Sequence, residues 1–435
     1  MTLNPEAVTS SSAPAALDEK SVKRIALAGG VGTLIEYYDY ALYGYATTVI
    51  APLFFPSSDP VASLLSALAV FALSYVIRPV GGIVFGAVGD RLGRKRALLI
   101  TILGVGVATS LVGILPTYAT VGLWAPVMLF VLRLAQGFFA GGEMGGAATV
   151  ISEFAPPAKR SRFGAYVPIG CNAGYAVASG AMGVVAGLMT DANLTEWGWR
   201  IPFLVALPLT IFCYVIRRRL PDMDAIAQGA AKHGFPFISL LRQYPKPLLK
   251  GLGLGIGIQG GAFIGSTFIA IYLVADLGYP KSAVYWITCG VQLFSVSVMP
   301  FTARWADRIG LWPVAIFGLT GYALLTYPAL VLMDRDSLVI ATLGYMLIII
   351  NMSLLQVSAY SLIPRLFPEE VRYTGSALII NLAVVIAGGT APFIATLLVR
   401  VTGDLRSPTL YVVATSVIGL IAMISLRNSK AVSRD

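Results

Sequence analysis

Two acids and two tyrosines lie on one face of an otherwise apolar segment near the N-terminus. In the stretch EYYDYALYGY (36–45), Glu36, Asp39, Tyr40 and Tyr43 follow the i, i+3, i+4, i+7 spacing of one helical stripe. An ionised side chain in the middle of a membrane costs roughly 2.5–3.5 kcal/mol. If this segment crosses a membrane, the stripe should therefore face a wet cavity rather than lipid.

Two arginines in other apolar segments, Arg78 and Arg133, could lie at a similar depth to these acids. A carboxylate can gain or lose a proton as its cavity opens and closes, whereas a guanidinium keeps its charge. We therefore predict that Asp39 carries a proton, with Glu36 as the runner-up. The planar fork of Arg133 suits a substrate carboxylate. The alternative is a fixed ion pair between the acids and Arg133 that never titrates.

Several further polar residues in apolar segments are candidates for the same cavity. Arg78 could bind substrate or simply tie its helix to neighbouring carbonyls. Glu143, in a glycine-rich segment, could be a further proton-coupling acid or a structural acid. The amides of the second half could line the cavity or join helices to one another. The predicted substrate-binding residues are Arg133, Tyr40, Tyr43, Tyr37, Arg78, Gln259, Gln356 and Asn381.

The elements that must hold these residues are membrane helices. Hydrophobic residues make up 57% of the 435 residues, charged residues only 12%, and the mean hydropathy is +0.79. Soluble domains carry roughly 25% charged residues. Apolar runs long enough to cross a bilayer number twelve. They lie at about 24–55, 63–88, 97–117, 124–151, 163–189, 198–216, 249–275, 283–304, 312–333, 337–362, 375–401 and 409–426.

The basic residues predict how the chain is oriented. With the N-terminus inside, 24 of the 31 lysines and arginines fall in cytoplasmic segments and five in outer segments. This asymmetry predicts a multi-pass protein of the cell membrane with both termini in the cytoplasm. The predicted parts are a disordered tail (1–22), a six-helix bundle (23–216), a central cytoplasmic loop (217–248), a second bundle (249–427) and a short cytoplasmic tail (428–435).

The two halves contain similar short sequences at matching places. GAVGDRLGRKR (86–96) and ARWADRIGLWP (303–313) follow the second and eighth spans, which puts Asp90 and Asp307 217 residues apart. Gly164 and Gly375, in the loops after the fourth and tenth spans, are 211 apart. The repeat predicts two halves related by an axis along the membrane normal. We expect the charged loops to form an inner gate; the alternative is solvated ion pairs of little consequence. The gate residues are Asp90, Arg91, Gly93, Arg94, Glu153, Arg162, Asp307 and Arg372.

Some of these sequences resemble a known family. GAVGDRLGRK (86–95) and RLAQGFFAGGE (133–143) resemble signatures of the major facilitator superfamily. With EYYDYALYG (36–44), RPVGG (78–82), WGWRIPF (197–203) and FPEEVRYTG (367–375), the pattern resembles its metabolite:proton symporter family. That family includes transporters of proline and betaine, α-ketoglutarate, shikimate and citrate. The resemblance implies an all-α fold of twelve transmembrane helices in two pseudo-symmetric six-helix halves.

These observations favour a proton-coupled symporter that imports a small organic anion by alternating access. The alternative is proton-coupled uptake of a zwitterionic osmolyte, and a proton-driven exporter is less well supported. An enzyme is not expected, because the one histidine, His233, lies in a polar loop and no phosphate-binding GKS or GKT is present. We expect no cofactor, metal site or nucleic-acid partner. The expected partners are the solute, protons and the lipid bilayer, with the protein working as a monomer.

Overall fold

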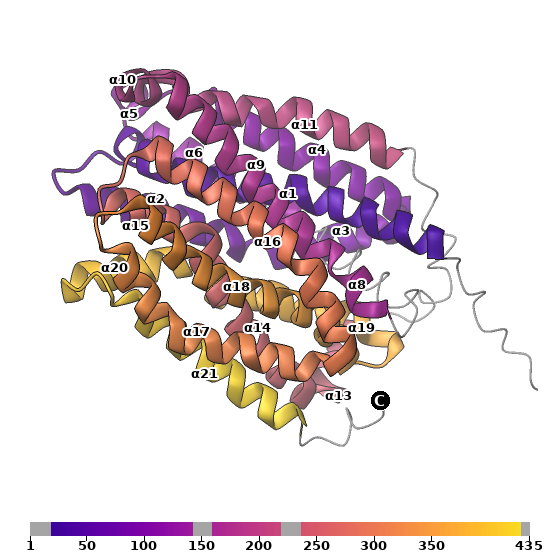
Figure 1. Ribbon diagram of the computed structural model, residues 1–435. Coiled ribbons are helices and arrows are strands. Elements are labelled where there is room, and N and C mark those ends of the chain that lie inside the picture. The colour runs from indigo at the N-terminus through magenta and orange to yellow at the C-terminus, as the bar shows by residue number, and fades with distance from the viewer. Residues whose placement is uncertain (1–18, 142–158, 219–235, 428–435) are drawn as a thin grey trace, which may run out of the picture.

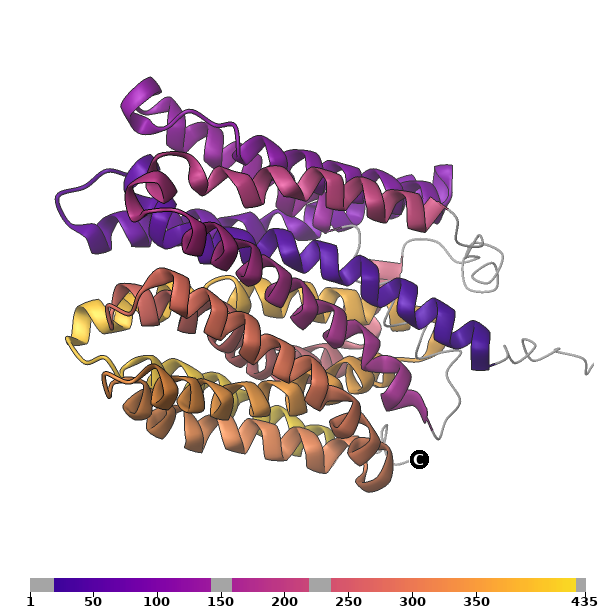
Figure 2. The same cartoon turned by 45° about the horizontal axis from the view of Figure 1, so that its top comes forward.

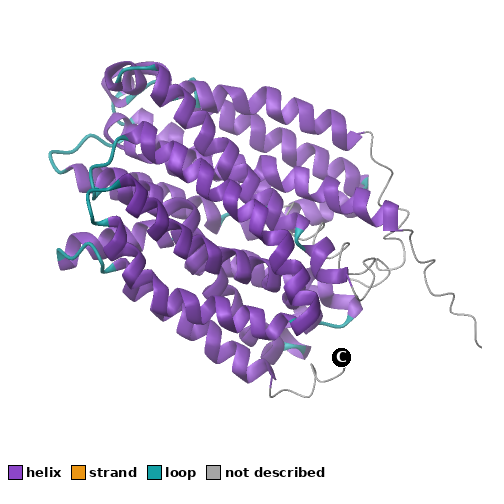
Figure 3. Ribbon diagram, viewed as in Figure 1, coloured by secondary structure: helices purple, strands orange, loops and turns teal. Residues whose placement is uncertain are grey.

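The computed structural model describes residues 19–141, 159–218 and 236–427, which form helices joined by short loops (Figures 1 and 3). No strand occurs among these residues. The first-half helices are α1 (Glu19–Phe54), α2 (Pro60–Val76), α3 (Arg78–Leu92), α4 (Arg94–Val112), α5 (Tyr118–Val121), α6 (Trp124–Ala140), α8 (Arg160–Gly164), α9 (Tyr166–Leu188), α10 (Asp191–Asn193), η2 (Leu194–Gly198) and α11 (Arg200–Arg218).

The second half has the same plan. Its helices are α13 (Pro236–Gln243), α14 (Pro245–Phe263), η3 (Ile264–Phe268), α15 (Ile269–Ala275), α16 (Lys281–Ile309), α17 (Leu311–Met333), α18 (Leu338–Leu362), η4 (Ile363–Leu366), α19 (Glu369–Ala383), η5 (Val384–Gly388), α20 (Ala391–Thr402) and α21 (Pro408–Arg427). Figures 1 and 2 show the two halves as neighbouring groups of long helices.

The described helices fit the predicted set of membrane spans. Nine are long and apolar enough to cross a membrane within the described ranges, and the bent pair η2/α11 could add a tenth. The other two predicted spans correspond to α1, whose acids and tyrosines lower its hydropathy, and to α6. The apolar helix α6 ends at Ala140, while the predicted span 124–151 runs past the described residues.

The central segment differs from its prediction. We expected one loop over 217–248, but α11 continues to Arg218, α13 occupies Pro236–Gln243 and α14 begins at Pro245. Prolines at the first position of a helix are favourable because their missing N–H would have no partner there. Pro236 and Pro245 both lie within the segment that was predicted as one loop. The wider division into two bundles and two tails stays a prediction.

The internal repeat is visible in the backbone. Gly93 ends α3 with φ 92° and Gly310 ends α16 with φ 93°, the same 217-residue spacing that separates Asp90 from Asp307. Non-glycine residues avoid these angles, so each glycine allows a sharp turn between two helices. Helix contacts between the halves also repeat: α16 packs on α8 and α9, while α3 packs on α19 and α2 on α20.

The molecule has two distinct ends. The loop end holds Gly93, Gly310 and α13, and the far end holds Asp59, Gly122 and Gly403. In Figure 1, α8, α13 and α19 mark the loop end, and α5, α10 and α20 mark the far end. Residues in the middle of the long helices therefore lie deep between the two ends.

Candidate functional site

A buried ion pair joins α1 to the start of α3. Glu36 and Arg78 are only 5% and 1% exposed, and Arg78 Nη2 lies 2.5 Å from Glu36 Oε1. The same nitrogen donates a hydrogen bond to the Tyr40 hydroxyl at 2.7 Å, and the guanidinium lies 4.5 Å from the centre of the Tyr40 ring. Arg78 therefore holds two members of the predicted stripe.

Arg133 is held by polar side chains of α6 and α2. The alternative to a substrate ligand was a fixed ion pair between Arg133 and the acids of α1, but one of these acids, Glu36, pairs with Arg78. Arg133 donates to Gln136 Oε1 at 2.9 Å and to Ser74 Oγ at 3.2 Å, and its Nε is buried without a hydrogen-bond partner. Both arginines were expected at a similar depth to the acids. Depth alone does not determine which arginine faces the acids, because this also depends on how each helix is rotated. Arg133 does lie within electrostatic range of Asp39.

Aromatic rings connect the two arginines and reach the second half. The Arg133 guanidinium lies 4.2 Å from the centre of the Tyr43 ring. Ring centres then lead from Tyr43 to Phe71 (6.0 Å), from Phe71 to Tyr75 (5.2 Å) and from Tyr75 to Tyr40 (5.3 Å). Phe263 of α14 lies 5.5 Å from Tyr75. A cation could be bound by such rings, because their faces carry negative potential.

Close helix contacts hold these residues together. A Cβ placed on Gly137 of α6 would collide with the carbonyl of Ser74, and one on Gly141 would collide with the carbonyl of Arg78. Small residues let membrane helices approach at backbone distance. The two glycines therefore bring α6 against the junction of α2 and α3, where Ser74 and Arg78 lie.

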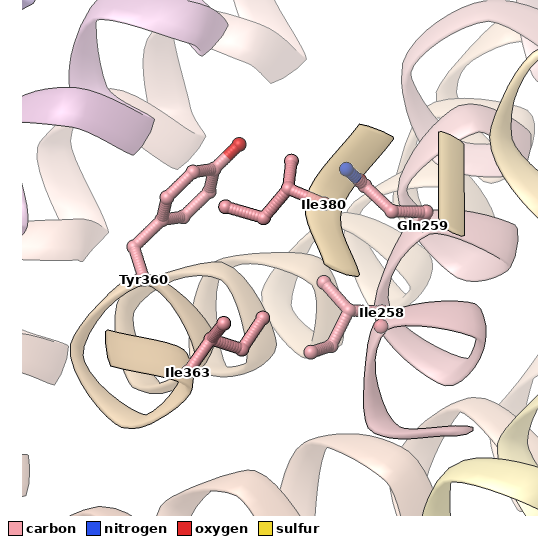
Figure 4. A pocket seen from close by; sticks show the side chains of 6 residues that line it. Ile258, Gln259, Tyr360, Ile363 and Ile380 are labelled. Atoms are coloured by element: carbon pink, nitrogen blue, oxygen red, sulfur yellow. The ribbon is translucent and has the colours of Figure 1, made fainter. Parts of the chain in front are cut away.

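Tyr37 lies off the stripe and faces the second half. Its hydroxyl is 3.5 Å from that of Tyr360 on α18. Tyr360 in turn lines a small cavity with Gly255, Ile258 and Gln259 of α14, Ile363, and Ile380 of α19 (Figure 4). Figure 4 shows the Tyr360 ring and Gln259 approaching this space from opposite sides. Gln259 thus borders a small cavity of the second half, and its role in substrate binding stays a prediction.

The other two predicted amides are held by the protein. Gln356 accepts a 2.6 Å hydrogen bond from Asn172 of α9, which joins the two halves. Asn381 donates to Ala377 in its own helix at 2.9 Å, while its Oδ1 is buried without a hydrogen-bond partner. Both side chains are at most 7% exposed. Gln356 therefore joins helices in this form, and Asn381 keeps an acceptor for another group.

The predicted gate is described in part. Arg162, just before α9, forms an ion pair with Asp307 of α16 at 3.2 Å, and the Ser161 amide donates to the same carboxylate at 3.1 Å. Glu143 and Glu153 lie outside the described residues, as do the side chains of Asp90 and Arg94. Arg91 is exposed, and Arg372 donates to the Phe367 carbonyl at 3.3 Å. The observed pair joins the halves rather than two loops of one half.

The far end carries further connections that were not predicted from the sequence. Arg400 pairs with Asp59 at 2.8 Å, and Lys281 approaches Asp191 at 3.7 Å; both pairs join the two halves. Tyr45 donates to the Ser266 carbonyl at 2.8 Å, and Tyr285 donates to the Tyr45 carbonyl at 3.0 Å. Since Arg162 and Asp307 also join the halves at the loop end, the described residues connect the halves at both ends.

Several residues of the site were missed by sequence reasoning. Gln136 and Ser74 bind Arg133, Asn172 binds Gln356, and the Tyr75 ring packs against the Arg78 guanidinium. A signal existed for two of them. Gln136 follows Arg133 at the i, i+3 spacing of helical neighbours. Tyr75 likewise precedes Arg78 by three residues. Ser74 and Asn172 lie on different helices from their partners, so no spacing along the chain relates them.

Comparisons with known proteins agree with this architecture. Residues 25–223 match a family model described as Sugar (and other) transporter. The chain is 31% identical to the proline/betaine transporter of Salmonella typhimurium over 425 residues, which cover 95% of this chain and 85% of that protein. It is also 31% identical to the ectoine/proline transporter ProP of Corynebacterium glutamicum, covering 92% and 82%.

A solved structure shows the same fold. The structure of the proton:xylose symporter XylE bound to 6-bromo-6-deoxy-D-glucose matches with a TM-score of 0.74 at 16% identity, covering 94% of this chain and 96% of that one. The fold is therefore that of a multi-pass membrane transporter of the major facilitator superfamily. With the similarity to the proline/betaine transporters, the chain belongs to the metabolite:proton symporter family of that superfamily. It is a transporter and not an enzyme.

Proposed function

We propose that this protein takes up a zwitterionic solute of the proline/betaine class together with protons. The observation that carries the proposal is Arg133, a buried guanidinium with an unpartnered Nε beside the aromatic rings. The guanidinium would bind the solute carboxylate. Tyr75, Phe71 and Phe263 would surround the positively charged nitrogen.

The charge of the described interior supports a neutral solute. Glu36 and Asp39 offset Arg78 and Arg133, so these four buried groups carry no net charge when ionised. An uncompensated charge in such surroundings is costly, whereas a zwitterion adds none. The relatives also favour this alternative over the organic anion that was expected first from the sequence, since their names refer to proline, betaine and ectoine.

Asp39 is our proposed proton carrier. Glu36 is already engaged by Arg78, whereas Asp39 lies near Arg133, the proposed solute ligand. A proton on Asp39 would remove the carboxylate that competes with the solute carboxylate for Arg133. Asp39→Asn should lose proton-driven uptake and keep solute exchange. If Asp39→Asn and Glu36→Gln both keep driven uptake, the proton site lies elsewhere, with Glu143 the next candidate.

Uptake into proteoliposomes tests the function. Proline and glycine betaine should accumulate when a pH gradient, acidic on the side of entry, is imposed, and should not accumulate without it. Arg133→Lys keeps the charge but loses the planar fork, so KM should rise at least tenfold; the exposed Arg304→Lys is the matched control. Accumulation of citrate or α-ketoglutarate instead would restore the organic-anion interpretation, and no driven uptake of any of these would refute the proposal.

The orientation is proposed on the basic residues. The loop end, with the segments after α3 and α16, would face the cytoplasm, because basic residues gather on that side. Labelling of single cysteines introduced at Thr117 and at Arg308 with an impermeant reagent on intact cells distinguishes the two ends. Only the Thr117 cysteine should react; the opposite result would invert the proposed topology.

A further inference from the structure

A second small cavity lies between α1 and α4, apart from the second-half cavity of Figure 4. Gly32, Ile35, Glu36 and Asp39 of α1 line it together with Ile102 and Val105 of α4. Its lining comes entirely from the first half, and it has room for about one water molecule. Both acids of the predicted stripe therefore border a space between α1 and α4.

The two cavities differ in chemistry. The cavity at Tyr360 and Gln259 is lined by amide, phenol and aliphatic groups of the second half and has no carboxylate. The α1–α4 cavity brings two carboxylates together. Buried water normally makes about three hydrogen bonds, and carboxylate oxygens are acceptors for it. A water there would touch both carboxylates, and none of the residues that line the cavity belongs to the second half.

Apart from the two acids, the surroundings of this cavity are apolar. Ile35 and Ile102 pack in one apolar cluster with Cys213 of α11, so its walls away from the acids are apolar. Among the described residues, Arg78 of α3 pairs with Glu36, and Arg133 of α6 lies within electrostatic range of Asp39. Tyr360 of α18 also lies within electrostatic range of Glu36. From α9, Cys171 lies within electrostatic range of Glu36. The described residues of α4 that line the cavity, Ile102 and Val105, bring no charge to it.

We propose that the α1–α4 cavity is the water site through which protons reach and leave Glu36 and Asp39, separate from the route of the solute between the halves. A hydronium in the cavity gives its proton to a carboxylate oxygen and becomes water; on release the carboxylic acid returns the proton to water. No other reactant is needed. The inference rests on the proposed proton coupling, and it assigns the coupling ion its own compartment.

Filling the cavity tests the proposal. Ile102→Phe and Val105→Phe place a larger side chain into it, since both residues are 4% exposed. The matched controls on the same helix are Ile100→Phe and Val107→Phe, which are 42% and 45% exposed. We expect the filled variants to lose at least tenfold of proton-driven uptake and of the accompanying proton entry, measured with an internal pH dye. Solute exchange at equal pH should stay within twofold, and the controls should match wild type.

Three outcomes of these experiments would refute the proposed proton route through the α1–α4 cavity. Driven uptake within twofold of wild type in the filled variants refutes the route, and an equal loss of driven uptake and exchange makes the cavity a packing feature. If neither filled variant folds, Ile102→Ala decides: the enlarged cavity should raise the rate of proton entry during uptake, and an unchanged or lower rate refutes the route. Wild-type uptake that ignores the pH gradient refutes the proposed function itself, a result distinct from all of these.

Discussion

The Glu36–Arg78 pair allows a prediction about stability, because Glu36 can be neutralised by a proton whereas Arg78 stays charged. Both side chains are nearly inaccessible and the two atoms are 2.5 Å apart. Removing one partner of such a pair typically costs about 3–5 kcal/mol, because the other charge stays buried. In Glu36→Gln, Arg78 remains charged. In Arg78→Gln, a proton can neutralise the unpaired Glu36, so the stability cost of this substitution should fall at low pH.

The expected magnitudes depend on the size of the chain. Unfolding entropy of about 2 cal/mol/K per residue converts 3–5 kcal/mol into a Tm lower by roughly 3–5 °C for 435 residues. Glu36→Gln should show this loss across pH 5–8, and Arg78→Gln should approach it only at pH 8. The variant with both substitutions should lose less stability than the two single variants together, because neither charge of the pair remains buried in it.

Thermal unfolding of the purified protein in detergent, followed by tryptophan fluorescence, measures these values. The exposed pair of Lys281 and Asp191 is the matched control: Lys281→Gln should cost less than about 1 kcal/mol, since exposed pairs are screened by water. Additive single effects, or a Glu36→Gln variant as stable as wild type at every pH, would show that the pair does not hold α1 against α3.

Three further changes probe other parts of the molecule. Gly137→Ala should abolish uptake and lower Tm, because the added methyl group would collide with a backbone carbonyl of α2; wild-type uptake would contradict the close packing. Burial raises the pKa of Asp276, in the loop after α15, from 3.8 to about 6. The neutral form is therefore favoured by folding, and up to about 3 kcal/mol of stability present at pH 4 should be lost as pH rises through 6. Asp276→Asn should remove this dependence in Tm measured from pH 4 to 8, and a slope equal to wild type would refute it. Asp307→Asn removes the charge that pairs with Arg162 and should speed thiol labelling of Cys171 by releasing the loop end; unchanged labelling, with the other two cysteines replaced, would argue against a gate.

The sequence alone determined the class of the protein and the candidates for its chemistry. Composition and apolar runs predict membrane helices because a backbone in lipid must satisfy its own hydrogen bonds. The repeated Asp90 and Asp307 sequences predict two related halves, and the matching turns at Gly93 and Gly310 agree. Acids and arginines within apolar spans stand out because burying charge is costly. All these signals are local in the chain.

The tertiary structure decided which candidates meet. Arg78 rather than Arg133 binds Glu36, and Tyr37 turns toward Tyr360, 323 residues away. The physical reason is that periodicity gives the face and approximate depth of a residue on its own helix. The rotation of one helix against another depends on packing contacts such as Gly137 against α2, which involve residues far apart in sequence. The placement of Glu36 and Asp39 beside α4, away from the cavity at Gln259, depends on the same helix packing.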